Sequence, residues 1–120
     1  MRSSRARVWS DPITLWRDAT LKAPTTWAPH YALGDSLQAA GRCAEAIDAY
    51  RRAVEILPDT ELRAYSNLGI CLAKERRFRE AEEAFRRALE HDPGYAPAHN
   101  NLGQLALVRK EYLMAVEHFD

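Results

Sequence analysis

Apolar and small side chains along this chain recur at the spacing of one face of an α-helix. His30, Leu33 and Leu37 fall on a single helical face, and the same spacing returns from Tyr65 onward. No stretch alternates convincingly between apolar and polar residues, so the pattern predicts helices and no strands. Breaks in the pattern divide the chain into helices of about 12 to 14 residues. The breaks within helix pairs fall at Gly41-Arg42, Arg76-Arg77 and Lys110-Glu111.

Several residue types return along the chain at a period of 34 or 35 residues. A small residue is needed where two helices cross closely, and an aromatic ring fills the wedge between successive helix pairs. Proline ends the second helix of each pair. These requirements predict one helix pair per period, stabilised by the stacking of neighbouring pairs. The recurring positions are Gly34, Gly69 and Gly103; Ala46, Ala81 and Ala115; Trp16, Tyr50, Phe85 and Phe119; and Pro24, Pro58 and Pro93.

This pattern resembles that of the tetratricopeptide repeat family over residues 11–120. The resemblance implies an all-α fold, a right-handed superhelical stack of antiparallel helix pairs. It divides the chain into a basic leader at 1–10, a half repeat at 11–26 that holds a second helix alone, repeats at 27–60 and 61–95, and a truncated repeat at 96–120. Ala106 departs from the pattern, because the family favours a large residue there, and this loosens the last helix pair.

Composition narrows the range of functions. Seventeen Lys and Arg residues balance seventeen Asp and Glu residues in a chain of 120, of which 47% are apolar. A chain without net charge lacks the basic surface that nucleic-acid binding usually requires, so no nucleic-acid partner is expected. RNA binding by pentatricopeptide-like repeats fits the period but not the Leu-Gly and Ala positions. The sequence contains no nucleophile–base arrangement, glycine-rich phosphate loop or paired carboxylates, so neither enzymatic activity nor a cofactor is expected.

Cysteine and histidine side chains are expected to pack within the helices rather than to bind metal. Cys43 and Cys71 fall at apolar positions of predicted helices, where a buried structural thiol is the ordinary interpretation. His30 and His99 share one position of the repeat, and no His-x-x-x-His pair occurs. The remaining histidines are His91 and His118. The sequence therefore predicts no metal site.

In the tetratricopeptide family, stacked first helices line a concave groove that binds extended peptides or partner helices. Positions spaced i, i+4, i+7 and i+11 along each first helix are expected to face that groove. Asn67 and Asn101 share one such position, and a carboxamide can pair with any peptide backbone; repeats attached to protein O-glycosyltransferases use a similar ladder. The alternative is that these side chains simply face water. The groove candidates are Tyr31, Asp35, Arg63, Asn67, Ile70, Lys74, Asn100, Asn101 and Gln104.

The resemblance predicts a protein-interaction scaffold that binds a protein or peptide in this groove. An alternative function is a soluble accessory domain that presents substrate to a membrane glycosyltransferase-like protein. This alternative rests on residues 9–24, which look similar to the junction after the last membrane helix of protein O-mannosyltransferase-like proteins, and on the preceding Arg2, Arg5 and Arg7. Any membrane contact would then lie in a segment upstream of this sequence. The sequence does not indicate in which cellular compartment the protein lies.

Both ends of the sequence indicate a fragment of a longer chain. The half repeat lacks its first helix, and the last repeat stops at Asp120, inside a predicted helix. Natural solenoids end in a polar capping helix, and none is predicted here. We therefore expect the uncovered face around Ala115 and Phe119 to promote self-association.

Overall fold

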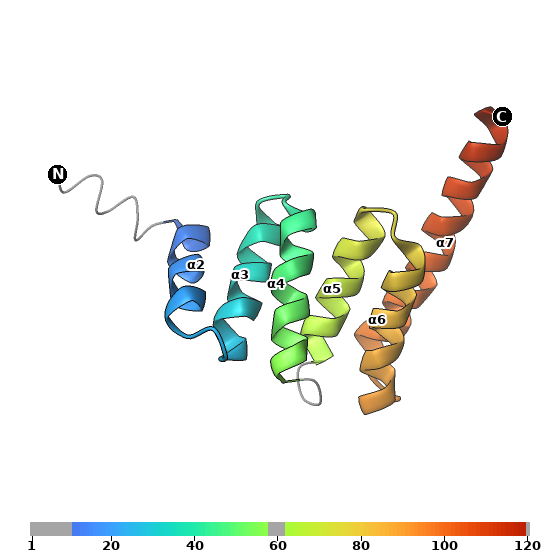
Figure 1. The fold of residues 1–120 in the computed structure, drawn as a ribbon. Helices are drawn as coiled ribbons and strands as arrows, with labels where there is room; N and C mark the ends of the chain where they lie inside the picture. The colour runs from blue at the N-terminus through green and yellow to red at the C-terminus, as the bar shows by residue number, and fades with distance from the viewer. Residues whose placement is uncertain (1–10, 58–61, 120) are drawn as a thin grey trace.

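The computed structural model describes residues 11–57 and 62–119, and in these ranges it contains six helices and no strand. The helices follow one another in a row, with the first and the last helix at opposite ends of the row (Figure 1). The basic leader and the turn at Pro58 lie outside the described residues. The helices are α2 (Pro12–Lys22), α3 (Trp27–Ala39), α4 (Cys43–Ile56), α5 (Leu62–Lys74), α6 (Phe78–His91) and α7 (Ala96–Phe119).

The arrangement is a solenoid of two helix pairs, flanked by one helix at each end. The pairs are α3 with α4 and α5 with α6, and each helix packs mainly on its neighbours in the chain. The first helices α3, α5 and α7 also contact one another in turn. The second helices are joined by ion pairs, Arg17 with Glu45 and Arg51 with Glu80. The prediction of an all-α tetratricopeptide-type stack is thus confirmed.

The turns inside the two complete pairs depend on one residue with a left-handed backbone. Gly41 has φ 75° and Arg76 has φ 61°, at the positions where the sequence predicts breaks. In the first turn the N–H of Arg42 donates to the carbonyl of Leu37 at 2.8 Å, which satisfies a carbonyl at the end of α3. The second turn repeats this hydrogen bond 35 residues later, at 2.9 Å. Both turns reverse the chain, so that the second helix packs on the first.

A glycine–aromatic contact holds each complete pair together. A Cβ atom added to Gly34 would lie 2.6 Å from Cε1 of Tyr50, and one added to Gly69 would lie 2.7 Å from Cδ1 of Phe85. Both rings are almost fully buried, at 0% and 1% exposure. The predicted requirement for a small residue at the helix crossing is met at these two positions, because any larger side chain would overlap the ring.

The third predicted helix pair does not form. The sequence predicts a break at Lys110-Glu111, but α7 runs without interruption from Ala96 to Phe119, so that prediction is wrong. A turn there would place Lys110 in the left-handed region, which is costly for any residue except glycine. The closed pair would also bury Ala106 at a position where Leu37 and Leu72 are 1% exposed. The neighbouring residues favour helix strongly, so the helix continues.

The continuous α7 changes the environment of the last repeat positions. Among the described residues, no atom would come within 4 Å of a Cβ added to Gly103, which is exposed. Ala115 is exposed as well, whereas Ala46 and Ala81 are fully buried. Gly103 and Ala115 therefore do not make the close helix–helix contacts that the repeat pattern predicts for them. The side chain of Phe119 lies outside the described part of the chain. Pro93 follows the C-cap residue Asp92 at the end of α6, where a helix-ending residue is expected.

Candidate functional site

The candidate groove is the surface carried by the first helices α3, α5 and α7. These helices contact one another in series, so their outward positions form a continuous surface. Apart from the exposed Asn100, the predicted groove residues fall into two groups on it. One group lies between α3 and α5 and is polar, and the other lies between α5 and α7 and is hollowed.

The polar group is a network of hydrogen bonds around Asp35. The hydroxyl of Tyr50 donates to Oδ1 of Asp35 at 2.6 Å and lies 2.8 Å from Oε1 of Gln38. Nδ2 of Asn67, on the next first helix, lies 3.3 Å from both Asp35 Oδ1 and the hydroxyl of Tyr31. The network therefore ties α3, α4 and α5 together at one end of the groove.

Aromatic rings extend this network toward the start of α5. The guanidinium of Arg63 lies over the ring of Tyr31, 5.5 Å from its centre, a cation–π contact. Tyr31 in turn packs against Tyr50, with ring centres 5.9 Å apart. Burial and the hydrogen bond to Asp35 raise the pKa of Tyr50 well above its usual range. Tyr50 therefore stays protonated and acts as a hydrogen-bond donor to Asp35 at any physiological pH.

The second group surrounds a hollow of about 230 Å³ between α5 and α7. Four predicted groove residues line it: Ile70, Lys74, Asn101 and Gln104. The remaining lining residues are apolar, Ala73, Phe85, Leu105 and Val108. The hollow thus combines an apolar interior with one ammonium group and two carboxamides. Asn100 is exposed and is not part of this lining.

The two asparagines of the predicted ladder have different surroundings. The amide of Asn67 is already engaged with Tyr31 and Asp35, although both distances are long. Asn101 lines the hollow instead. A ligand that pairs with both would have to compete with the existing contacts at Asn67, whereas Asn101 faces the hollow where a ligand would sit.

Sequence comparison identifies the family. Residues 25–93 match a family model described as tetratricopeptide repeat, and residues 84–117 match a second model with the same description. The first match alone covers more than half of the 120 residues. The chain belongs to the tetratricopeptide repeat family. Domains of this family are generally non-catalytic interaction modules.

Individual proteins resemble parts of this tetratricopeptide chain. It is 49% identical over 55 residues to Protein POLLENLESS 3-LIKE 2 of Arabidopsis thaliana, a match that covers 46% of this chain and 12% of that protein. A crystal structure of the MamA protein superposes with a TM-score of 0.76 at 23% identity, covering 89% of this chain and 58% of that one. The Arabidopsis OM64 TPR domain has a TM-score of 0.74 at 17% identity, covering 88% and 86% of the two chains. The two structural matches support the fold.

Two histidines close the turns that precede first helices in the tetratricopeptide stack. Nε2 of His30 lies 2.9 Å from the carbonyl oxygen of Pro24, and Nε2 of His99 lies 2.7 Å from that of Pro93. The shared repeat position of these histidines thus corresponds to a shared hydrogen bond. In residues 11–57 and 62–119, no three His, Cys, Asp or Glu side chains are arranged to hold a metal ion. In the same ranges, no helix is long and apolar enough to cross a bilayer.

The two cysteines of the tetratricopeptide stack contact each other, although the helical periodicity does not predict this contact. Cys43 begins α4 and Cys71 lies in α5, and their Sγ atoms are 2.6 Å apart. Both thiols are buried, and burial together with the contact to Cys43 raises the pKa of Cys71 well above its usual range. A high pKa disfavours the thiolate, so the folded protein should react slowly with oxidants.

We expect Cys43 and Cys71 to form a disulfide when the protein is refolded with glutathione disulfide. The two thiols would lose two protons and two electrons, and the oxidant would be reduced to two glutathione molecules. Mass spectrometry should show a mass lower by two hydrogen atoms and no attached glutathione. The variant Cys71→Ser should instead carry one glutathione at Cys43. A refolded protein that keeps two alkylatable thiols would contradict the expectation.

Proposed function

We propose that this chain is a protein-interaction scaffold that binds an extended peptide or a partner helix along the surface of α3, α5 and α7. The observation that carries the proposal is the hollow between α5 and α7. An apolar interior with a few polar groups at its edge is typical of sites that bind a peptide side chain. The predicted groove residues Ile70 and Gln104 lie together in that hollow, which supports a binding surface there.

The chemistry of the hollow suggests how a ligand would be held. An apolar side chain of the ligand would fill the space next to Ile70 and Val108, since burial of apolar surface favours binding. The carboxamides of Asn101 and Gln104 offer donors and acceptors to the ligand backbone beside that side chain. Lys74, which is exposed at the end of α5, would attract an acidic residue of the ligand. The favoured ligand is therefore a peptide that carries an apolar residue next to an acidic one.

Selection from a displayed library of random peptides tests this proposal. The wild-type chain should enrich peptides with an apolar residue next to an acidic residue. Ile70→Asp should weaken their binding by more than about tenfold, because it places in the hollow a negative charge like that of the acidic residue of the peptide. Leu21→Asp is the matched control, since Leu21 is 80% exposed on α2, away from the groove. Equal binding by Ile70→Asp and wild type would show that the hollow is not the site.

A second variant tests the carboxamides separately. Asn67→Ala combined with Asn101→Ala should weaken peptide capture and leave the helix content unchanged, as measured by circular dichroism. Unchanged binding would remove the asparagine ladder from the proposal while leaving the hollow as the binding site.

A further inference from the structure

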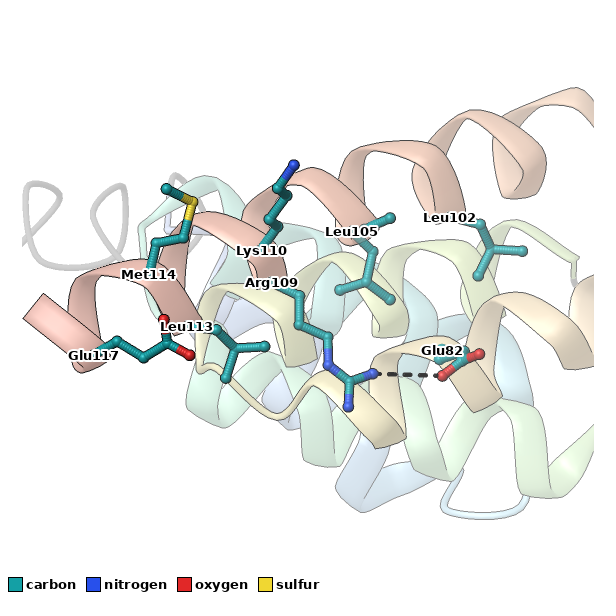
Figure 2. Close-up of a pocket in the computed structure, with 9 residues that line it drawn as sticks. Glu82, Leu102, Leu105, Arg109, Lys110, Leu113, Met114 and Glu117 are labelled. Atoms are coloured by element: carbon teal, nitrogen blue, oxygen red, sulfur yellow. Dashed lines mark ion pairs between the residues drawn. The ribbon is translucent and has the colours of Figure 1, made fainter.

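A second hollow lies on the other side of α7, against α6. It has a volume of about 480 Å³, and we call it the α6–α7 crease. Figure 2 shows its lining along α7, with the ion pair between Arg109 and Glu82 at one side. The apolar residues of the crease are Leu102, Leu105, Ala106, Leu113 and Met114. None of the predicted groove residues lies in it, although Leu105 lines both this crease and the hollow between α5 and α7.

The repeat pattern indicates which kind of segment fits the crease. In both complete pairs a second helix covers the glycine of the first helix, and its aromatic residue follows that glycine by 16 residues. Gly103 is the corresponding glycine of α7, and among the described residues nothing covers it. The second helices α2, α4 and α6 are linked by ion pairs, and the crease lies beyond α6 in that row. The crease therefore lies where one more second helix would pack.

The chain itself carries a segment with the sequence of that helix. Residues 111–119 contain Ala115 at the position of the buried Ala46 and Ala81, and Phe119 at the position of Tyr50 and Phe85. This segment belongs to the continuous α7, where its Leu113, Met114 and Glu117 line the crease while Ala115 does not. It exposes apolar side chains there, including Leu113, Met114 and Val116, at 52%, 60% and 40%.

We propose that two copies of this chain exchange residues 111–119, so that each segment packs as a second helix in the α6–α7 crease of the other copy. The crease and the segment with the second-helix pattern belong to one chain, but because α7 is unbroken the segment cannot fold back into the crease of its own chain. Exchange of an identical element between two copies is a low-cost route to a dimer. The exchange is reciprocal and closes with two chains. Each copy supplies a second helix that covers the crease of the other.

The exchange avoids the cost of closing the pair within one chain. A closed pair requires a left-handed residue at Lys110, the position of Gly41 and Arg76. In the exchanged dimer α7 stays helical through this position, as it is in the structure. The exchange therefore buries the apolar face of residues 111–119 without forming that turn.

Two substitutions in α7 test the exchange in the full chain by analytical ultracentrifugation. Ala115→Glu places a carboxylate at a position that is fully buried in both complete pairs, and should weaken dimerisation more than about a hundredfold. Leu107→Glu is the matched control, because Leu107 is 63% exposed on the same helix and does not line the crease. Leu107→Glu should dimerise like wild type. A wild-type chain that stays monomeric at millimolar concentration, or equal loss of dimer in both variants, would overturn the proposal.

A crosslinking experiment separates exchange from simple end-to-end association. Chains carrying Ala106→Cys are mixed with chains carrying Ala115→Cys and treated with a short bismaleimide. Residues at these two positions are buried in one core in the complete pairs, so the mixture should give a covalent heterodimer. Lys110→Gly should convert the dimer to a monomer, because glycine permits the left-handed turn. Dimers that form no crosslink in the mixture, or that persist unchanged in Lys110→Gly, would contradict the exchange.

Discussion

Replacement of Phe85 by alanine should lower the free energy of unfolding by about 3–5 kcal/mol. The ring is 1% exposed, fills the crossing of α5 and α6 above Gly69, and also lines the groove hollow. A glycine partner has no side chain that can move into the space, so the cavity would remain open. Urea denaturation followed by far-ultraviolet circular dichroism measures the change.

The control for this experiment is an exposed apolar residue. Leu21→Ala, on α2, removes a side chain that is 80% exposed and should change the free energy of unfolding by less than about 0.5 kcal/mol. A loss below about 1 kcal/mol for Phe85→Ala would mean that the neighbouring helices close over the space, and that the glycine–aromatic contact does not hold the pair together. Peptide binding should weaken as well, since Phe85 forms part of the wall of the hollow.

The two complete helix pairs could be predicted from sequence because their determinants recur at a fixed period. Gly34 and Tyr50 are separated by the same interval as Gly69 and Phe85, and the contact between each pair of residues lies within one helix hairpin. Helical periodicity likewise places Ile70 and Lys74 on one face of α5, where both line the same hollow. Local spacing is sufficient for such predictions, since neighbouring turns of a helix are rigidly related.

The continuation of α7 could not be predicted from the same pattern. Gly103 and Ala115 repeat the spacing of the complete pairs, but a turn at Lys110 forms only when the contacts of the closed pair outweigh the left-handed backbone. Arg76 bears this cost because α6 buries Phe85 on α5, whereas the last repeat offers Ala106 in place of a leucine. A sequence pattern shows which residues are present, but not whether the packing of a closed pair outweighs the cost of a left-handed backbone at the turn.

Contacts between different repeats could not be predicted from the sequence either, and the reason is geometric. Cys43 begins the second helix of one pair, and Cys71 lies near the end of the first helix of the next, so their contact depends on how successive pairs stack. The hydrogen bonds from Asn67 to Tyr31 and Asp35 depend on stacking in the same way, and on the rotamers of three side chains. Periodicity places each of these residues on a helix face but does not fix the angle between helices.

Two glycines at the same repeat position should respond to substitution with opposite sign. At Gly69 a Cβ would lie 2.7 Å from Cδ1 of the buried Phe85, so Gly69→Ala should lower the free energy of unfolding by about 1–3 kcal/mol despite the better helix propensity of alanine. At Gly103, among the described residues, nothing lies within 4 Å of an added Cβ. Gly103→Ala should therefore stabilise the monomer by about 0.5–1 kcal/mol, measured at concentrations too low for dimers.

A double-mutant cycle then links the two large effects to one contact. If the cost of Gly69→Ala arises from overlap with the ring of Phe85, the cost should disappear when Phe85→Ala is already present. In that background Gly69→Ala should stabilise the protein by about 1 kcal/mol, because only the helix propensity remains. Additive effects of the two substitutions would show that the strain lies elsewhere. They would also remove the main reason for glycine at this repeat position, since Gly69 would then not be required by the approach of the ring.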